Sequence, residues 1–121
     1  MSKPKVLLAE DDLTMISLLK TLLKMEGFEV VTLQADADVL AAIRNENPDV
    51  LLLDVHLGHQ NGLEILGNIR SSADINKTRV VMSSGANVKE ECMSQGAFGF
   101  LMKPYMPDEL TTLLKQAIKS A

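Results

Sequence analysis

The chain has 121 residues, 46% of them hydrophobic and 23% charged, which is the composition of a globular domain rather than a disordered one. Twelve lysines and arginines against 16 acidic residues give a net charge of −4, which argues against direct nucleic-acid binding, because counterion release needs clustered cations. No apolar run reaches the roughly 18 to 20 residues of a membrane span, and the first residues lack the apolar segment of a signal peptide. We therefore expect one cytoplasmic domain over residues 1–121.

Short β-branched apolar runs alternate with amphipathic segments five times along the chain. Strands are predicted at residues 6–9, 30–33, 50–53, 80–82 and 99–102. Helices are predicted after Asp12 as far as Gly27, from an N-cap at Asp36 to about Asn47-Pro48, and over residues 63–69, 88–95 and 107–119. This alternation is typical of an α/β fold, a doubly wound parallel sheet of five strands flanked by five helices. The run at 50–53 is apolar throughout, which places it in the middle of the sheet.

Polar side chains fall where the predicted strands end. Glu10 and Asp11 follow the first strand, Asp54 the third, Ser84 the fourth and Lys103 the fifth. Ligands of an open parallel sheet bind outside the carboxyl ends of its strands, so we expect these five side chains to meet at one edge. The single cysteine, Cys92, excludes an internal disulfide and a multi-cysteine metal site.

The chemistry of these side chains indicates phosphoryl transfer. Glu10, Asp11 and Asp54 would repel one another unless a cation neutralised them, and Mg²⁺ is the hard ion that prefers oxygen ligands and phosphate. Lys103 supplies a positive charge, and Ser84 supplies a hydroxyl donor, for a phosphoryl oxygen. Asp54 follows the most apolar strand and is the expected nucleophile, which leaves Glu10 and Asp11 as metal ligands.

Four motif elements in this order resemble the receiver domain of bacterial two-component response regulators, the CheY-like family. The elements are Glu10-Asp11 after the first strand, Asp54 with Gly62 eight residues later, Ser84-Gly85 after the fourth strand, and Lys103-Pro104. The resemblance covers nearly the whole chain. It implies a strand order of 2-1-3-4-5, phosphorylation of Asp54 by a sensor histidine kinase or phosphotransfer protein, and Mg²⁺ as the required ion.

The resemblance also implies roles for single residues. Asp11 and Asp54 would bind the metal directly, Glu10 through water, and His56 through its backbone carbonyl. Ser84 would bond the phosphoryl group and Lys103 would pair with it. Phe100 would be the aromatic residue that turns inward on phosphorylation. This movement would switch the face formed by residues 88–95, 99–102 and 107–119, where a downstream effector domain or protein would bind.

The sequence departs from the family pattern at three places. The position four residues after Asp54, usually proline, is Gly58, which predicts a looser loop before the third helix. The interval from Ser84 to Lys103 is 19 residues, shorter than is usual in the family, so the helix at 88–95 is predicted to be short. Phe100 lacks the hydroxyl of a tyrosine switch.

Two other functions stay open at the level of sequence. A Mg²⁺-dependent phosphatase would use Asp54 as a transient nucleophile, but Asp54-Val55-His56 lacks a second acid two residues on. A pseudo-receiver would bind partners without phosphorylation, although every required type of side chain is present. We expect no enzyme activity beyond the chain's own phosphorylation from a phosphodonor and its own dephosphorylation.

Overall fold

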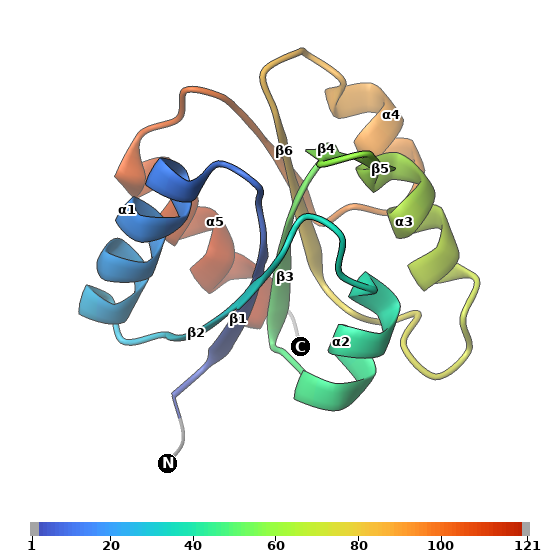
Figure 1. Ribbon diagram of the computed structural model, residues 1–121, viewed down its shortest axis with the longest axis horizontal. Coiled ribbons are helices and arrows are strands. Elements are labelled where there is room, and N and C mark those ends of the chain that lie inside the picture. Colours follow the sequence, from blue (N-terminus) through green and yellow to red (C-terminus); the bar gives the residue numbers. More distant parts are fainter. Residues whose placement is uncertain (1–2, 120–121) are drawn as a thin grey trace.

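The computed structural model describes residues 3–119, and its strands and helices alternate in the order that the sequence predicts (Figure 1). In chain order the elements are β1 (Lys5–Ala9), α1 (Leu13–Met25), β2 (Glu29–Leu33), α2 (Val39–Glu46), β3 (Val50–Asp54), β4 (His56–Leu57), β5 (Gln60–Asn61), α3 (Gly62–Arg70), β6 (Val80–Ser84), α4 (Lys89–Ser94), β7 (Gly99–Met102) and α5 (Pro107–Lys119). Among the described residues, no helix has both the length and the apolar character needed to cross a membrane.

The five main strands form one parallel sheet in the order β2-β1-β3-β6-β7. Numbered without the short β4 and β5, this is the order 2-1-3-4-5 and confirms the predicted fold. The register aligns the carboxyl ends of the strands, because Ala9 pairs with Leu53, and Asp54 pairs with Ser83. Every residue of β3 is buried, as predicted for a strand in the middle of the sheet.

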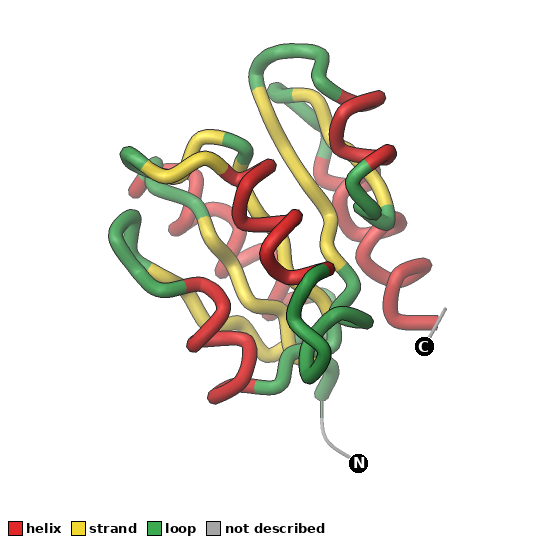
Figure 2. The backbone as a smooth tube through the Cα atoms, turned by 90° about the vertical axis from the view of Figure 1, so that its right-hand side faces the viewer, coloured by secondary structure: helices red, strands yellow, loops and turns green. Residues whose placement is uncertain are grey.

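Helices cover both faces of the sheet (Figures 1 and 2). Successive side chains of a strand point to opposite faces, so each strand contributes to two cores. Leu7, Leu51 and Met82 pack in a cluster with buried residues of α2, α3 and α4. Leu8 and Leu52 pack in the other cluster with residues of α1 and α5. The two cores hold the sheet between its two layers of helices.

Aspartate side chains cap the start of α1 and of α2. Asp12 caps α1 as predicted, since its side chain accepts a hydrogen bond from the backbone N–H of Met15 at 3.1 Å. The prediction for α2 is wrong by two residues, because the cap is Asp38 and not Asp36. Asp38 has extended backbone and its side chain reaches the N–H of Ala41 at 3.0 Å, whereas Asp36 lies in the turn before it.

The segment after Asp54 differs from the prediction of a looser loop. Residues 56–61 form a small antiparallel hairpin, in which His56 pairs with Asn61, and Leu57 pairs with Gln60. Gly58 adopts a φ of +59° at the turn, which a proline would not allow. The helix predicted to be short is confirmed, since α4 has six residues.

Candidate functional site

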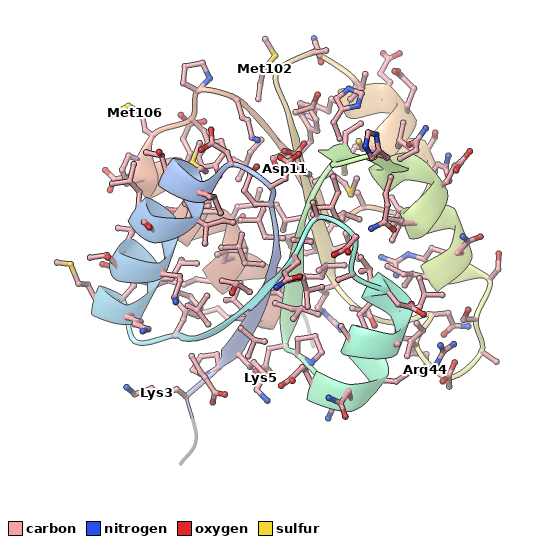
Figure 3. The ribbon with its side chains drawn as sticks, viewed as in Figure 1. Lys3, Lys5, Asp11, Arg44, Met102 and Met106 are labelled. Atoms are coloured by element: carbon pink, nitrogen blue, oxygen red, sulfur yellow. The ribbon has the colours of Figure 1, made fainter. Side chains whose placement is uncertain are left out.

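The carboxyl edge of the sheet brings the sequence-predicted side chains together. Asp54 ends β3, Ser84 ends β6, Glu10 follows β1, and Lys103 follows β7. Figure 3 shows Asp11 at the same edge, above the sheet. Glu10, Asp54 and Ser84 are at most 5% exposed, although all three are polar. Buried polar groups need partners, and their contacts decide what this edge can do.

Lys103 joins two of the buried carboxylates. Its Nζ lies 2.7 Å from Oε1 of Glu10 and 2.7 Å from Oδ2 of Asp54. The partners are 93 and 49 residues away along the chain. The remaining oxygens are also bonded: Oε2 of Glu10 accepts from the N–H groups of Asp11 and Asp12, and Oδ1 of Asp54 accepts from the N–H of His56 at 3.0 Å. One ammonium therefore compensates two carboxylates that are otherwise held by backbone donors.

Burial and charge shift the proton affinities of this group. Burial raises the pKa of Glu10, and its hydrogen bond with Lys103 only partly offsets this. Burial alone would lower the pKa of Lys103, but the hydrogen bonds to Asp54 and Glu10 outweigh it and raise the pKa. Lys103 is therefore a fixed positive charge at neutral pH, facing carboxylates that can bind a further cation.

Asp11 completes a set of three acids that fits a metal ion. Carboxylate oxygens of Glu10, Asp11 and Asp54 all lie within 4.8 Å of one another. Asp11 is exposed, and its Oδ2 accepts a hydrogen bond from the N–H of Gly58 at 3.0 Å. Hard oxygen donors with one member open to solvent match Mg²⁺, which keeps several waters when it binds to proteins. Both oxygens of Glu10 and both oxygens of Asp54 already accept hydrogen bonds, so Asp11, which is exposed, is the most accessible ligand of the three.

The other predicted residues lie close to this set or on the strands beside it. The Ser84 hydroxyl accepts from the N–H of Ala86 at 3.1 Å, and the Ser84 carbonyl accepts from the N–H of Lys103 at 2.8 Å. Ser84 and Lys103 are thus tied together through the backbone. Phe100 is half-buried on β7, beside Met82, and packs against the core under α2, α3 and α4. His56 is exposed, and its N–H contacts Asp54.

The sequence did not predict two features near this site, the hairpin of residues 56–61 and the buried hydroxyl of Tyr105. The hairpin of residues 56–61 has the signal of a two-residue turn, Gly58-His59, but its strands are too short to show alternation. Tyr105 follows Lys103-Pro104 and buries its hydroxyl, which has no hydrogen-bond partner in the described part of the chain. Burial raises the pKa of Tyr105 to about 12, so the hydroxyl stays protonated. No pattern in the sequence distinguishes this residue from a core aromatic.

Comparisons with known proteins agree on one family. Residues 6–115 match the family described as Response regulator receiver domain. The transcriptional regulatory protein CpxR of Klebsiella pneumoniae is 33% identical over 118 residues, which cover 95% of this chain and 49% of CpxR. The chain also spans about half the length of the curated relatives called DNA-binding response regulator MtrA, 52% in Mycobacterium leprae.

Solved structures have the same fold. The receiver domain of the Francisella response regulator 1452 superposes with a TM-score of 0.87 and 26% identity, over 97% of this chain and 98% of that one. The receiver domain of a sensor histidine kinase from Pseudomonas aeruginosa superposes with a TM-score of 0.80 over 98% of this chain and 99% of that one. Its identity is 22%, so this second likeness concerns the fold alone.

Proposed function

Because the chain belongs to the response regulator receiver domain family, we propose that it is the phosphoacceptor module of a two-component phosphorelay and that Asp54 is the residue phosphorylated. One observation carries the proposal. The Asp54 carboxylate ends a fully buried strand, lies 2.7 Å from the Lys103 ammonium, and shares a 4.8 Å cluster with Glu10 and Asp11. A carboxylate held in this way is a fixed nucleophile with a counter-charge already in place.

The proposed reaction transfers a phosphoryl group from a phosphohistidine of the donor protein to Asp54. A carboxylate oxygen of Asp54 forms a bond to phosphorus while the bond from phosphorus to the histidine nitrogen breaks, and the donor imidazole leaves and takes up a proton. The His56 N–H keeps Oδ1 of Asp54 oriented, and the Lys103 ammonium neutralises charge on the transferred group. The same residues would hold the product for hydrolysis, so the chain acts only on its own acyl phosphate.

Mg²⁺ is the cofactor in this proposal. As the family resemblance implies, Asp11, Asp54 and the His56 carbonyl would hold it directly, and Glu10 would do so through water. The ion would supply positive charge for the oxygens of the phosphoryl group. The Pseudomonas receiver domain is described with magnesium coordinated in its active site cleft. That ion belongs to the other protein, and the support here is the cluster of three carboxylates.

Phosphorylation would switch a surface made by α4, β7 and α5. It changes about one negative charge into roughly two and adds three acceptor oxygens. The Ser84 hydroxyl would donate to one of these oxygens and give up its contact with the Ala86 N–H. The loop that leads to α4 begins at this contact, and Phe100 on β7 packs against the same core. A shift of Ser84 would thus move α4 and let Phe100 turn inward.

A receiver domain of this kind needs a phosphoryl donor and a partner that binds the switched surface. A sensor histidine kinase or phosphotransfer protein would supply the phosphohistidine, and a downstream effector domain or protein would bind the switched face. The relatives called DNA-binding are about twice as long as this chain, and we assign no direct nucleic-acid contact to residues 1–121, which carry a net charge of −4. We place this single receiver domain in the cytoplasm, where such kinases present their phosphohistidine.

Intact-mass spectrometry after incubation with Mg²⁺ and acetyl phosphate tests the proposal. We expect a gain of one phosphoryl group that requires Mg²⁺ and is lost in Asp54→Asn. Asp74→Asn, at the opposite edge of the sheet, is the matched control and should be labelled normally. Turnover of external phosphate esters would favour a phosphatase instead. Absence of labelling, together with unchanged amide spectra in beryllofluoride, would favour a pseudo-receiver.

A further inference from the structure

The hairpin of residues 56–61 touches both of the acids proposed as direct metal ligands. The N–H of His56 donates to Oδ1 of Asp54, and the N–H of Gly58 donates to Oδ2 of Asp11, each at 3.0 Å. Asp11 lies after β1 and Asp54 ends β3, so the hairpin bridges two strands of the sheet. The distance between these two carboxylates therefore depends on where the hairpin is held.

One side chain fixes the free end of this hairpin. The Gln60 amide nitrogen donates to the backbone carbonyls of Ala35 and Ala37, both at 2.9 Å, in the loop between β2 and α2. Carbonyl oxygens only accept hydrogen bonds, so the NH₂ group of the Gln60 side chain must face them, and this fixes the orientation of the amide. Both hydrogens of the NH₂ group are used in these two bonds. Gly58 lies against the same loop, since a β-carbon there would be 2.9 Å from Cβ of Ala35.

The hairpin turn makes the contact with Asp11 possible. Gly58 is the first residue of the two-residue turn, with a φ of +59°, as in a type II′ hairpin. A proline at this position has no N–H and could not donate to Asp11. The family usually has proline at this position. The hydrogen bond between the Gly58 N–H and Asp11 is therefore possible because this chain has glycine there instead.

We propose that Gln60 is a positioning residue for the metal site. It clamps the hairpin to the loop between β2 and α2, and the clamped hairpin holds Asp11 and Asp54 at the spacing that a divalent cation needs. The inference rests on the proposed function, because the metal is part of it. Residues that orient metal ligands from outside the coordination shell change metal affinity about 10- to 100-fold when they are replaced.

Two substitutions of Gln60 separate the clamp from simple charge effects. Gln60→Glu keeps the shape but sets carboxylate oxygens against the two carbonyls of Ala35 and Ala37. Gln60→Ala removes the donors without adding charge. An added negative charge by itself strengthens cation binding, whereas loss of the clamp weakens it, so the two effects of Gln60→Glu have opposite signs. Gln34→Glu adds the same charge at the exposed first position of the same loop and is the matched control.

The test is a titration with MgCl₂ alone, followed by amide NMR shifts, together with the exchange rate of the Gly58 amide in the metal-free chain. We expect Gln60→Ala to raise the Mg²⁺ Kd about tenfold and Gln60→Glu to raise it by less, because its added charge opposes the loss of the clamp. Both variants should speed exchange of the Gly58 amide. Gln34→Glu should bind Mg²⁺ as tightly as the unaltered chain or more tightly. Unchanged affinity in both Gln60 variants would overturn the inference.

The design separates this inference from the proposed function. If the unaltered chain shows no Mg²⁺-dependent shifts, the proposed metal is wrong, and the role of Gln60 in holding it is wrong too. The exchange rate of the Gly58 amide is measured without metal, so it still tests whether Gln60 holds the hairpin in place. Faster exchange at Gly58 in Gln60→Ala supports the clamp, and an unchanged rate overturns it.

Discussion

The two edges of the parallel sheet both carry ion pairs, but the pairs differ in burial. At the carboxyl edge Lys103 joins Glu10 and Asp54, whose side chains are 3% and 7% exposed. At the opposite edge Arg44 pairs with Asp74, with side chains that are 46% and 58% exposed. Figure 3 shows Asp11 in the upper middle of the molecule and Arg44 at the lower right. Contact distances are the same, 2.7 Å in each pair.

The comparison shows that distance alone does not identify a functional charge. A buried carboxylate has lost its water and depends on its partners, whereas an exposed pair exchanges them for solvent at little cost. The amino edge also has a hollow of about 620 Å³ between α2 and the loop before β6. Its lining holds charged side chains of both signs, most of them exposed.

The largest effect should come from Lys103→Met. This change leaves Glu10 and Asp54 buried without their shared counter-charge, so we expect the free energy of unfolding to fall by about 2 to 3 kcal/mol at pH 7. Urea denaturation measures this loss. Saturating Mg²⁺ should recover part of it, because a bound cation replaces the missing charge. Lys115→Met, in the exposed pair with Glu26, should change stability little, and an equal loss there would contradict the role of burial.

The next effect should come from Gly58→Ala. Its φ of +59° strains a side chain, and the new Cβ would lie 2.9 Å from Cβ of Ala35. We expect a loss of about 1 to 2 kcal/mol in urea denaturation. Gly85→Ala is the control, since nothing lies within 4 Å of its added β-carbon. The double variant with Ala35→Gly should recover the part of the loss that comes from the contact between the two β-carbons, whereas the cost of the positive φ and of the 3.2 Å approach to the Ala35 carbonyl oxygen should remain. A loss in Gly85→Ala as large as that in Gly58→Ala would contradict this account.

The free energy of unfolding, measured over a series of pH values, tests the contribution of Glu10. Its pKa is raised above the ordinary 4.5, mainly by burial, so the folded state holds this proton more tightly than the unfolded state. The resulting stabilisation is present below pH 4.5 and is lost as the pH rises through the folded pKa. In Glu10→Gln we therefore expect a flatter fall of the unfolding free energy above pH 4.5. The exposed Glu90→Gln should keep the slope of the unaltered chain, and equal slopes in all three would contradict the shift.

The smallest effect should come from Arg44→Ala. Its hydrogen bonds with Asp74 raise the pKa of the guanidinium and lower that of the carboxyl, yet both groups lie in solvent. We expect no measurable change in the unfolding midpoint and normal labelling by acetyl phosphate. A clear drop in either measurement would mean that the amino edge contributes more than its exposure indicates.

The sequence by itself determined the layers of the fold and the residue types at the site. Period-two and period-3.6 patterns follow from the backbone of strands and helices, so the five strands of the parallel sheet and the five helices of the described chain could be assigned locally. Because parallel strands share one carboxyl edge, Glu10, Asp11, Asp54, Ser84 and Lys103 could be grouped without coordinates. The cap of α2 was misplaced because Asp36 and Asp38 are chemically equal, and only the backbone distinguishes them.

Tertiary structure alone decided which of these groups touch. Lys103 reaches Glu10 and Asp54 across 93 and 49 residues, a choice set by the register of β1, β3 and β7. Gln60 finds Ala35 and Ala37 only because two loops meet above the sheet edge. Such contacts depend on how separate elements pack against one another. The periodicity of residues along the chain does not predict that packing. The clamp at Gln60 was therefore invisible in the sequence, whereas the acids that it is proposed to position were not.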